Sequence, residues 1–277
     1  MIRRFVLFAF IMAAPLAGQN FIQMSDPQFG MYTKNVGFAH ETANFEFAIA
    51  TANRLKPAFV VVTGDLINDS KNAAQAAEYK RISAKLDPKI RLFSVPGNHD
   101  VENEPDEQTL AAYRKRVGPD YYTFRIGEIA GFVLNSNLEK APQKVPGEAA
   151  KMENWLREEL GKAKRDGVKH LIVFQHISFF LSDPDEEDQY FNIPKETRKR
   201  YLKLLHDAGI QYVFAGHYHR NAEGRDADLQ MVTTGPVGMP LGGAKSGMRL
   251  VTVNDSGVQH KYYELGELPE TIEPEKP

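Results

Sequence analysis

The sequence of 277 residues contains no cysteine. Disulfide bonds and thiolate metal sites are therefore excluded, and the composition is compatible with an oxidising compartment. The chain also lacks an excess of charge of one sign, because 34 basic and 36 acidic residues leave a formal net charge of −2. This balance gives no general electrostatic attraction to nucleic acid. With 42% hydrophobic and 25% charged residues, the composition is that of a globular domain with a substantial core.

The N-terminal apolar run, from Phe5 to Ala17, is too short for a membrane-spanning helix, which needs ~20 residues. Two arginines precede the run, and the small residues Ala17 and Gly18 end it. This pattern predicts a signal peptide over residues 1–18 and export to the periplasm or the extracellular space after cleavage. A membrane anchor is the alternative interpretation. Gln19 stands where a lipoprotein would carry its lipidated cysteine, which excludes a lipid anchor.

Strand and helix patterns alternate along the rest of the chain. Apolar runs predict strands at residues 21–24, 59–65, 170–176 and 211–217, and a strand followed by a turn over residues 91–100. A hairpin is predicted at 121–136, and further strands are predicted near the C-terminus. Helical spacing of apolar residues predicts helices over 42–55, 72–86, 106–117, 148–165 and 195–208. No linker separates the halves, so we expect one α/β domain over residues 19–267, with strands in central sheets and helices outside.

Two segments stand apart from this alternation. Residues 182–192, "SDPDEEDQYFN", are acidic and aromatic and predict a surface loop near the strand ends. Residues 268–277 are rich in proline and glutamate with few apolar residues, which predicts a disordered, solvated acidic tail.

Five predicted strands end in residues of the kinds that bind metals. These residues are Asp26, Asp65, Asn98, His176, and His217 with His219. In open α/β sheets, ligands bind beyond the carboxyl ends of the strands, so the five ends converge on one region. Carboxylate, amide oxygen and imidazole together suit divalent Mn, Fe or Zn. The set offers more donors than one ion needs, which predicts two ions a few ångströms apart.

The ordered blocks D…GD…GNHD…H…GHYH, which span residues 26–219, resemble the calcineurin-like metallophosphoesterase superfamily. The stretches "DPQFG", "DEEDQYFN", "GHYHRNAEG" and "YYELGEL" resemble one subgroup more closely. It is called calcineurin-like phosphoesterase domain-containing protein and is described as a serine/threonine phosphatase. The resemblance implies a sandwich of two mixed β-sheets flanked by helices. It also implies a dinuclear-metal-dependent phosphomonoesterase, a phosphoric ester hydrolase.

The resemblance also implies a set of ligands. The first metal would be held by Asp26, Gln28, Asp65 and His219, and the second by Asp65, Asn98, His176 and His217, with Asp65 bridging. Gln28 occupies a position where the superfamily usually has histidine. Its amide oxygen is a neutral, harder donor than imidazole, so we expect a weaker first site that favours Mn, Mg or Fe over Zn. A hydrogen-bonding role behind the ligands is the alternative for Gln28.

His99 is implied to be the general acid over the leaving group rather than a ligand. Asp100 would hold the other nitrogen of His99 and raise its pKa. A hydroxide held by the metals would attack phosphorus in line.

Three functions remain open at this point. The first is a phosphomonoesterase acting on phosphoserine or phosphothreonine in proteins or on small phosphate esters, and export favours the small esters. The second is a phosphodiesterase of the cyclic-nucleotide type, which shares "GDL" and "PGNHD" but usually keeps histidine at the position of Gln28. The third is a non-catalytic binding scaffold. For all three we expect no nucleic-acid partner, no membrane span in the mature chain and no obligate protein partner.

Overall fold

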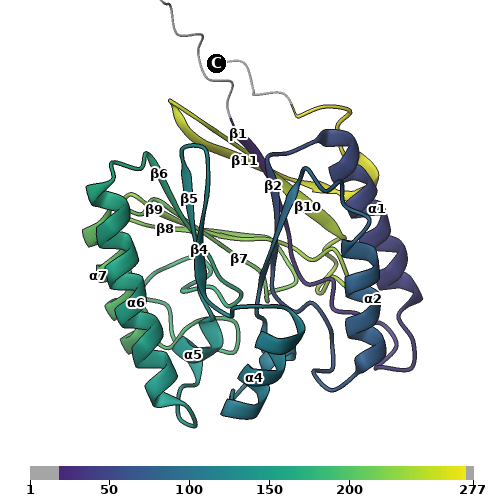
Figure 1. The fold of residues 1–277 in the computed structure, drawn as a ribbon, viewed down its shortest axis with the longest axis horizontal. Helices are drawn as coiled ribbons and strands as arrows, with labels where there is room; N and C mark the ends of the chain where they lie inside the picture. Colours follow the sequence, from purple (N-terminus) through teal and green to yellow (C-terminus); the bar gives the residue numbers. More distant parts are fainter. Residues whose placement is uncertain (1–18, 273–277) are drawn as a thin grey trace, which may run out of the picture.

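Two mixed β-sheets pack face to face in a computed structural model that describes residues 19–272 (Figure 1). The first sheet has the order β11-β10-β1-β2-β3 and comprises β1 (Gln19–Met24), β2 (Phe59–Thr63), β3 (Arg91–Val95), β10 (Gly247–Asn254) and β11 (Gly257–Glu264). The second has the order β4-β5-β6-β7-β9-β8 and comprises β4 (Tyr122–Ile126), β5 (Ile129–Val133), β6 (His170–Phe174), β7 (Tyr212–Ala215), β8 (Ala222–Asp226) and β9 (Leu229–Thr233). The predicted two-sheet α/β sandwich is confirmed.

Helices cover the outer face of each sheet. α1 (Ala39–Leu55) and α2 (Ala73–Ser83) lie against the first sheet, and α6 (Pro146–Arg165) and α7 (Lys195–Ala208) against the second (Figure 1). Four shorter helices complete the list, namely α3 (Asn98–Val101), α4 (Glu107–Arg116), α5 (Ser136–Lys140) and the 3₁₀ turn Leu265–Glu267. Among the helices of residues 19–272, none has the length and apolar character needed to cross a membrane.

Local sequence signals explain where the helices begin and end. α4 starts with a reciprocal cap, in which Thr109 N donates to Asp106 Oδ1 (2.8 Å) and Asp106 N donates to Thr109 Oγ1 (3.0 Å). α7 ends at Gly209, whose φ of 80° is the left-handed conformation that favours glycine. These signals fix helix boundaries within one or two residues of those predicted from the sequence.

The central strands are buried on both faces, as their uniformly apolar sequences predict. In β2, Phe59 and Val61 belong to the cluster between the two sheets, whereas Val60 and Val62 pack on the helix side. The layer between the sheets is rich in phenylalanine, and the rings of Phe21 and Phe59 stack with centroids 4.7 Å apart. Such pairs contribute about 0.5–1.5 kcal/mol beyond area burial, so this layer fixes the relative position of the two sheets.

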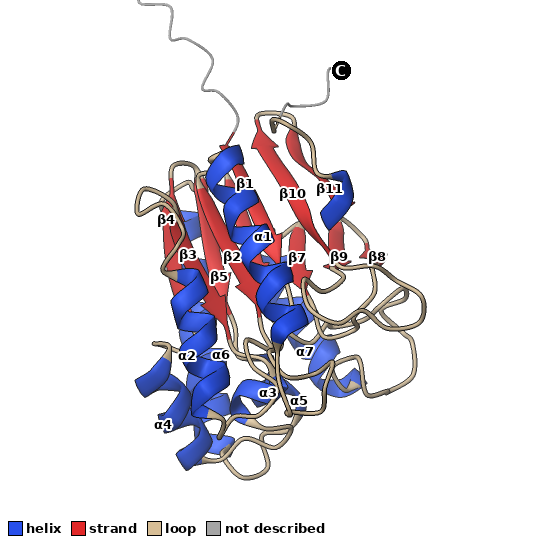
Figure 2. Ribbon diagram, turned by 90° about the vertical axis from the view of Figure 1, so that its right-hand side faces the viewer, coloured by secondary structure: helices blue, strands red, loops and turns tan. Residues whose placement is uncertain are grey.

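The carboxyl ends of the parallel strands lie on one side of the molecule. β1, β2 and β3 run parallel in the first sheet, and β5, β6, β7 and β9 run parallel in the second. Figure 2 shows the loops and the short helices α3 and α5 gathered beyond these ends. The strand ends that carry the predicted ligands therefore meet across the two sheets.

Some elements differ from expectation. β8, with the sequence AEGRD, has no strand signal and forms only as the edge partner of β9. Residues 98–101, expected as part of a turn, form the short helix α3. The predicted signal peptide, residues 1–18, and residues 273–277 lie outside the described residues.

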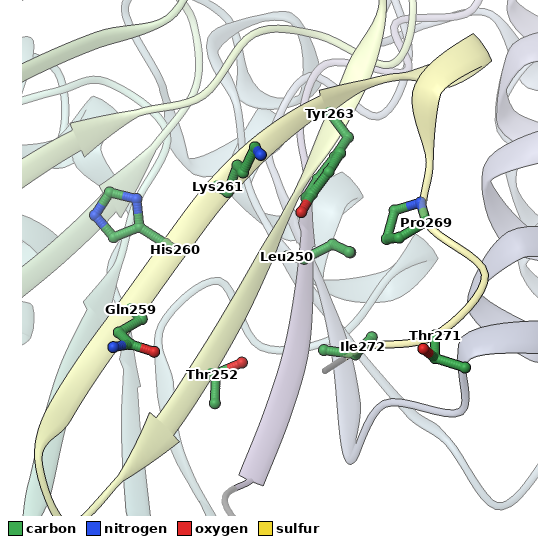
Figure 3. Close-up of a pocket in the computed structure, with 9 residues that line it drawn as sticks. All are labelled: Leu250, Thr252, Gln259, His260, Lys261, Tyr263, Pro269, Thr271 and Ile272. Atoms are coloured by element: carbon green, nitrogen blue, oxygen red, sulfur yellow. The ribbon is translucent and has the colours of Figure 1, made fainter. Parts of the chain in front are cut away.

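Residues 268–272 pack on the protein instead of forming the expected solvated tail. Leu268 and Ile272 contact the core, and Arg54 Nη1 donates to the carbonyls of Pro269 (2.8 Å) and Glu270 (2.7 Å). This segment lines a cavity of about 160 Å³ together with β10 and β11. Figure 3 shows the side chains that line it. None of the predicted ligands lines this cavity, so it is separate from the strand-end region.

Candidate metal centre

Backbone hydrogen bonds join the loops that follow the strands. Asp26 N donates to Gly64 O (3.1 Å), and Gln28 N donates to Asp65 O (2.9 Å). Within the second sheet, Gly216 N donates to His176 O (3.0 Å). The loops after β1 and β2, and those after β6 and β7, are thus tied in pairs at the point where the ligands are predicted.

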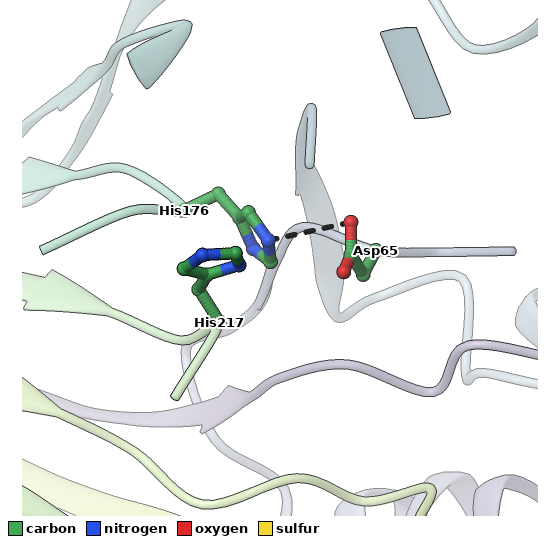
Figure 4. Close-up of side chains that lie close together, drawn as sticks. All are labelled: Asp65, His176 and His217. Carbon is green, nitrogen blue, oxygen red and sulfur yellow. Dashed lines mark ion pairs between the residues drawn. The ribbon is translucent and has the colours of Figure 1, made fainter. Parts of the chain in front are cut away.

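Two groups of buried side chains in residues 19–272 place three potential metal ligands within 4.8 Å of one another. One group is Asp65, His176 and His217, and the other is Asp26, Asp65 and His219. Figure 4 shows the first group, in which His176 Nε2 lies 3.3 Å from Asp65 Oδ1 and the ring of His217 lies beside that of His176. Both groups share Asp65, so the structure brings together two adjacent sets of donors around one carboxylate.

The backbone is strained at these residues. Five of the ten described non-glycine residues with positive φ are predicted ligands, namely Asp26, Gln28, Asp65, His217 and His219. A non-glycine residue in such a conformation costs of order 1–3 kcal/mol and persists where the surrounding structure determines it, typically at functional sites. The strain therefore supports a functional role for these strand ends.

Two glycines leave room for the ligands. A Cβ atom on Gly97 would lie 2.2 Å from Asp65 Oδ1, and one on Gly64 would lie 2.3 Å from His176 Nδ1. Gly64 also has a φ of 89°, which an L-residue rarely adopts. The glycines of "GD" and "GNHD" are thus required by close packing around Asp65 and His176.

Each of the four histidines at the site places one ring nitrogen against a backbone carbonyl. The pairs are His99 Nδ1 with Asn68 O (2.7 Å), His176 Nδ1 with Thr63 O (2.8 Å), His217 Nε2 with Tyr190 O (3.2 Å) and His219 Nδ1 with Met239 O (2.5 Å). A carbonyl only accepts, so the nitrogen facing it carries the proton, and in a neutral imidazole the other nitrogen keeps its lone pair. This arrangement prepares the ligand histidines to bind metal.

The carboxylates are held with similar specificity. Asp26 Oδ2 accepts from Ser25 Oγ (2.5 Å) and from His217 N (3.1 Å), and Asp26 Oδ1 lies 3.4 Å from His219 Nε2. Asp65 Oδ1 accepts from His99 N (2.9 Å). Hydrogen bonds behind a ligand fix its orientation and typically change metal affinity 10- to 100-fold.

Both predicted amide ligands turn their NH₂ groups toward other side chains. Asn98 Nδ2 donates to Asn103 Oδ1 (3.2 Å) and Tyr190 Oη (3.3 Å), and its Oδ1 lies 3.1 Å from His176 Nε2. Gln28 Nε2 donates to Asn68 Oδ1 (3.1 Å), and Gln28 Oε1 is buried without a hydrogen-bond partner. A buried oxygen without a partner is costly unless something else binds it, which fits a cation ligand.

The charges of the site are strongly coupled. Burial raises the pKa of Asp65, but the imidazoles of His176 and His99 outweigh it and hold that pKa well below its usual range. Burial lowers the pKa of His176, but Asp65 outweighs it and raises that pKa to about 9. Burial and the nearby His176 lower the pKa of His217 to about 3. A metal ion at this position must therefore displace a proton from His176.

The predicted contact between Asp100 and the ring of His99 is wrong. His99 Nδ1 faces Asn68 O instead, while Asp100 Oδ2 accepts from Gly97 N (2.8 Å) and Leu66 N (3.1 Å). Burial, together with Asp65, raises the pKa of Asp100 to about 7. Asp100 binds the backbones of the "GD" and "GNHD" loops to each other, because α3 turns its side chain back toward the helix start. His99 is the half-buried member of "GNHD", whereas its neighbours Asn98 and Asp100 are buried.

Sequence analysis missed two residues that the structure brings to the site. Tyr190, 51% exposed, lies over His217 with ring centroids 4.8 Å apart, and its loop comes from the acidic segment 182–192. The aromatic pair within that acidic segment was the available signal. Asn68 contacts both His99 and Gln28, and only its position three residues after Asp65 could have suggested a role.

Comparisons with known proteins agree with this geometry. Residues 20–221 match the sequence profile described as Calcineurin-like phosphoesterase. The chain is 38% identical over 266 residues to serine/threonine-protein phosphatase CPPED1 of Homo sapiens, an alignment covering 90% of this chain and 85% of the relative.

Solved structures share the fold at low sequence identity. A dimetal phosphatase from Danio rerio is 16% identical with a TM-score of 0.64, covering 92% of this chain and 98% of that one. GAP50, described as the anchor in the inner membrane complex of Plasmodium, is 16% identical with a TM-score of 0.66, covering 90% and 85%. At such identity these two structures establish the fold alone.

Proposed function

The chain belongs to the calcineurin-like phosphoesterase family and is a metal-dependent phosphoric ester hydrolase, and we propose that its substrates are phosphate monoesters. The observation that carries this proposal is the pair of ligand groups that share Asp65. A catalytic centre built in this way is suited to one phosphoryl group held between two cations.

The residues present fit two divalent cations. We assign Asp26, Gln28, Asp65 and His219 to the first cation and Asp65, Asn98, His176 and His217 to the second. The unpartnered Gln28 Oε1 and the backbone-oriented histidines support this assignment. Carboxylate, amide and imidazole donors suit Mn or Fe, with Zn as the softer alternative. When bound, the cations would acidify water and neutralise phosphoryl charge.

The chain's own proton donor is His99. Asn68 O accepts from Nδ1 (2.7 Å), so the protonated ring directs Nε2–H away from that carbonyl. We propose that this N–H protonates the leaving oxygen. The half-buried position of His99 gives a substrate access to the ring.

The substrate class is proposed from two sources. The relative's name describes a serine/threonine-protein phosphatase, which supports phosphoserine and phosphothreonine esters. If the chain is exported, small alkyl phosphate esters fit better, because phosphoproteins are few in the periplasm and the extracellular space. Small alkyl esters have the same poor alkoxide leaving group as phosphoserine and phosphothreonine. Both substrates depend on protonation of that group.

Purified protein with Mn²⁺ is expected to hydrolyse p-nitrophenyl phosphate much faster than bis-p-nitrophenyl phosphate. A monoester offers an additional ionised phosphoryl oxygen to the two cations, and a diester does not. Parallel rates of p-nitrophenol release test the proposal. Faster hydrolysis of the diester would favour the phosphodiesterase alternative, and no activity with Mn²⁺, Fe²⁺ or Zn²⁺ would favour a scaffold.

We also propose that residues 1–18 direct export. The motivation is the order of two arginines, an apolar run and small residues. Expression of the full chain in a bacterium is expected to give a periplasmic product that begins near Gln19, as measured by intact mass after fractionation. A full-length cytoplasmic product would contradict export without affecting the hydrolase assignment.

A further inference from the structure

Four side-chain amides form a hydrogen-bonded series that ends at the first metal site. We call this series the amide chain, and it consists of Gln28, Asn68, Asn35 and Gln75. Gln28 and Gln75 are buried, with 1% and 0% of their surfaces exposed, while Asn35 lies in an exposed loop. No motif of the sequence identifies these four residues as a unit.

The polarity of the amide chain is fixed at its far end. Gln75 Oε1 accepts from two backbone donors, Asn68 N (3.1 Å) and Asp69 N (2.9 Å). A backbone N–H can only donate, so the atom of Gln75 that it faces must be the oxygen. The other end of that amide, Nε2, is therefore the group that reaches Asn35.

This polarity passes from one amide to the next. Gln75 Nε2 lies 2.8 Å from the atom of Asn35 that it contacts, so that atom must be the oxygen, Oδ1. The same Oδ1 lies 2.8 Å from Asn68, which must present its Nδ2 there. The other end of the Asn68 amide, Oδ1, therefore faces Gln28. The Gln28 atom that lies 3.1 Å from this oxygen must be a donor, Nε2. Gln28 Oε1 is the atom left without a partner.

The fold reserves space for this arrangement. A Cβ atom on Gly30 would lie 2.3 Å from Gln75 Nε2 and 2.8 Å from Asn35 Oδ1. Gly30 has a φ of 106°, so a side chain is disfavoured there by conformation as well as by contact. The glycine of "DPQFG" thus makes room for the amide chain.

We propose that the amide chain acts as a positioning device that selects the oxygen of Gln28, rather than its NH₂ group, as the donor to the first metal. An amide oxygen has lone pairs for a cation, whereas an amide NH₂ has only hydrogens to offer. Histidine at this position would need no such device, because either nitrogen of its ring can carry the lone pair. The proposal rests on the assignment of Gln28 as a ligand.

The test is Mn²⁺ binding measured by titration of the metal-free protein, with the free ion followed by electron paramagnetic resonance. Asn68→Leu removes the acceptor for Gln28 Nε2, and first-site affinity is expected to fall by about tenfold or more. Asn68→Asp keeps the acceptor for Gln28 Nε2 and loses only the donor to Asn35 Oδ1, so it should weaken binding less than Asn68→Leu does. Gln28→Glu presents oxygen in either orientation, so adding Asn68→Leu to it should cause no further loss.

A second pair of variants covers the case in which Asn68→Leu does not fold. Asn35 is exposed and has a φ of 70°, a conformation that glycine and aspartate adopt readily. Asn35→Gly removes the acceptor that two NH₂ groups share, whereas Asn35→Asp retains it. The glycine variant is expected to weaken the first site in the Gln28 protein but not in the Gln28→Glu protein.

The outcomes distinguish the positioning role of the amide chain from the assignment of Gln28 as a ligand. Equal losses from Asn68→Leu or Asn35→Gly in the Gln28 and Gln28→Glu backgrounds would mean that the amides act only through packing, which overturns the proposal. No loss from them, while Gln28→Ala weakens the first site, would also overturn it and leave Gln28 as a ligand. Unchanged affinity in Gln28→Ala would overturn both the ligand assignment and the proposal, while monoester hydrolysis would still report on the function itself.

Discussion

Replacing Asp65 with asparagine is expected to remove most bound metal and nearly all hydrolytic activity while the protein stays folded. Asp65 belongs to both groups of potential ligands, so its charge lies between the two proposed cations and partly cancels their repulsion. The neutral amide cannot do this, and one of its two ends has no lone pair for a cation. Since hydrogen bonds behind a ligand already change affinity 10- to 100-fold, loss of a shared ligand should exceed about 100-fold.

Metal analysis after dialysis, together with a thermal unfolding curve, measures this effect. Asparagine can still accept the hydrogen bond from His99 N, so the "GNHD" loop keeps its anchor. Asp207→Asn is a matched control, because that aspartate is exposed in the last turn of α7, pairs with Lys203 (2.7 Å) and belongs to neither ligand group. Two ions still bound to the Asp65→Asn protein would refute the shared-ligand assignment.

Substitution of His99 by alanine is expected to preserve both metals and to slow hydrolysis of alkyl phosphates by ~10²–10⁴-fold, the range of a general acid. His99 is absent from both ligand groups, and its ring is oriented by Asn68 O. With p-nitrophenyl phosphate the loss should be smaller, because the nitrophenolate leaves without a proton. The ratio of the two losses, measured at saturating Mn²⁺, is the diagnostic quantity.

The Asp100→Asn variant is the comparison for His99→Ala, because it tests whether Asp100 takes part in proton donation. Asp100 binds Gly97 N and Leu66 N rather than the ring of His99, so its replacement should affect loop stability and both substrates alike. A selective loss on alkyl phosphates in the Asp100 variant would revive a role in proton donation. Equal losses on both substrates in His99→Ala would instead assign His99 to phosphate binding.

The sequence was sufficient to predict the strands that carry ligands because each is a short apolar run followed by a glycine or a polar turn. "FVVVTGD" shows this best, since its uniform burial on both faces and the carboxylate at its end are both visible in the letters. The pairing of the strands into two sheets came from the resemblance to known phosphoesterases. Edge strand β8 could not be predicted, because AEGRD becomes a strand only through its pairing with β9.

At the site, the sequence predicted which side chains come together but not which hydrogen bonds they make. Residue types at strand ends predicted which side chains would meet, because parallel strands share a carboxyl edge. Hydrogen-bond partners were not predictable, since they depend on backbone carbonyls such as Asn68 O that no sequence motif marks. Asp100 follows His99 directly, yet the helical turn of α3 points its carboxylate back to Gly97. Adjacency in sequence was a poor guide to contact at this position.

The central claim is that one carboxylate, Asp65, lies between two divalent cations. Crystals grown with Mn²⁺ and measured at the manganese absorption edge test it most directly. We predict two anomalous peaks a few ångströms apart, one beside Asp26, Gln28 and His219 and the other beside Asn98, His176 and His217, with Asp65 between them. A single peak, or peaks that do not flank Asp65, would contradict the dinuclear centre.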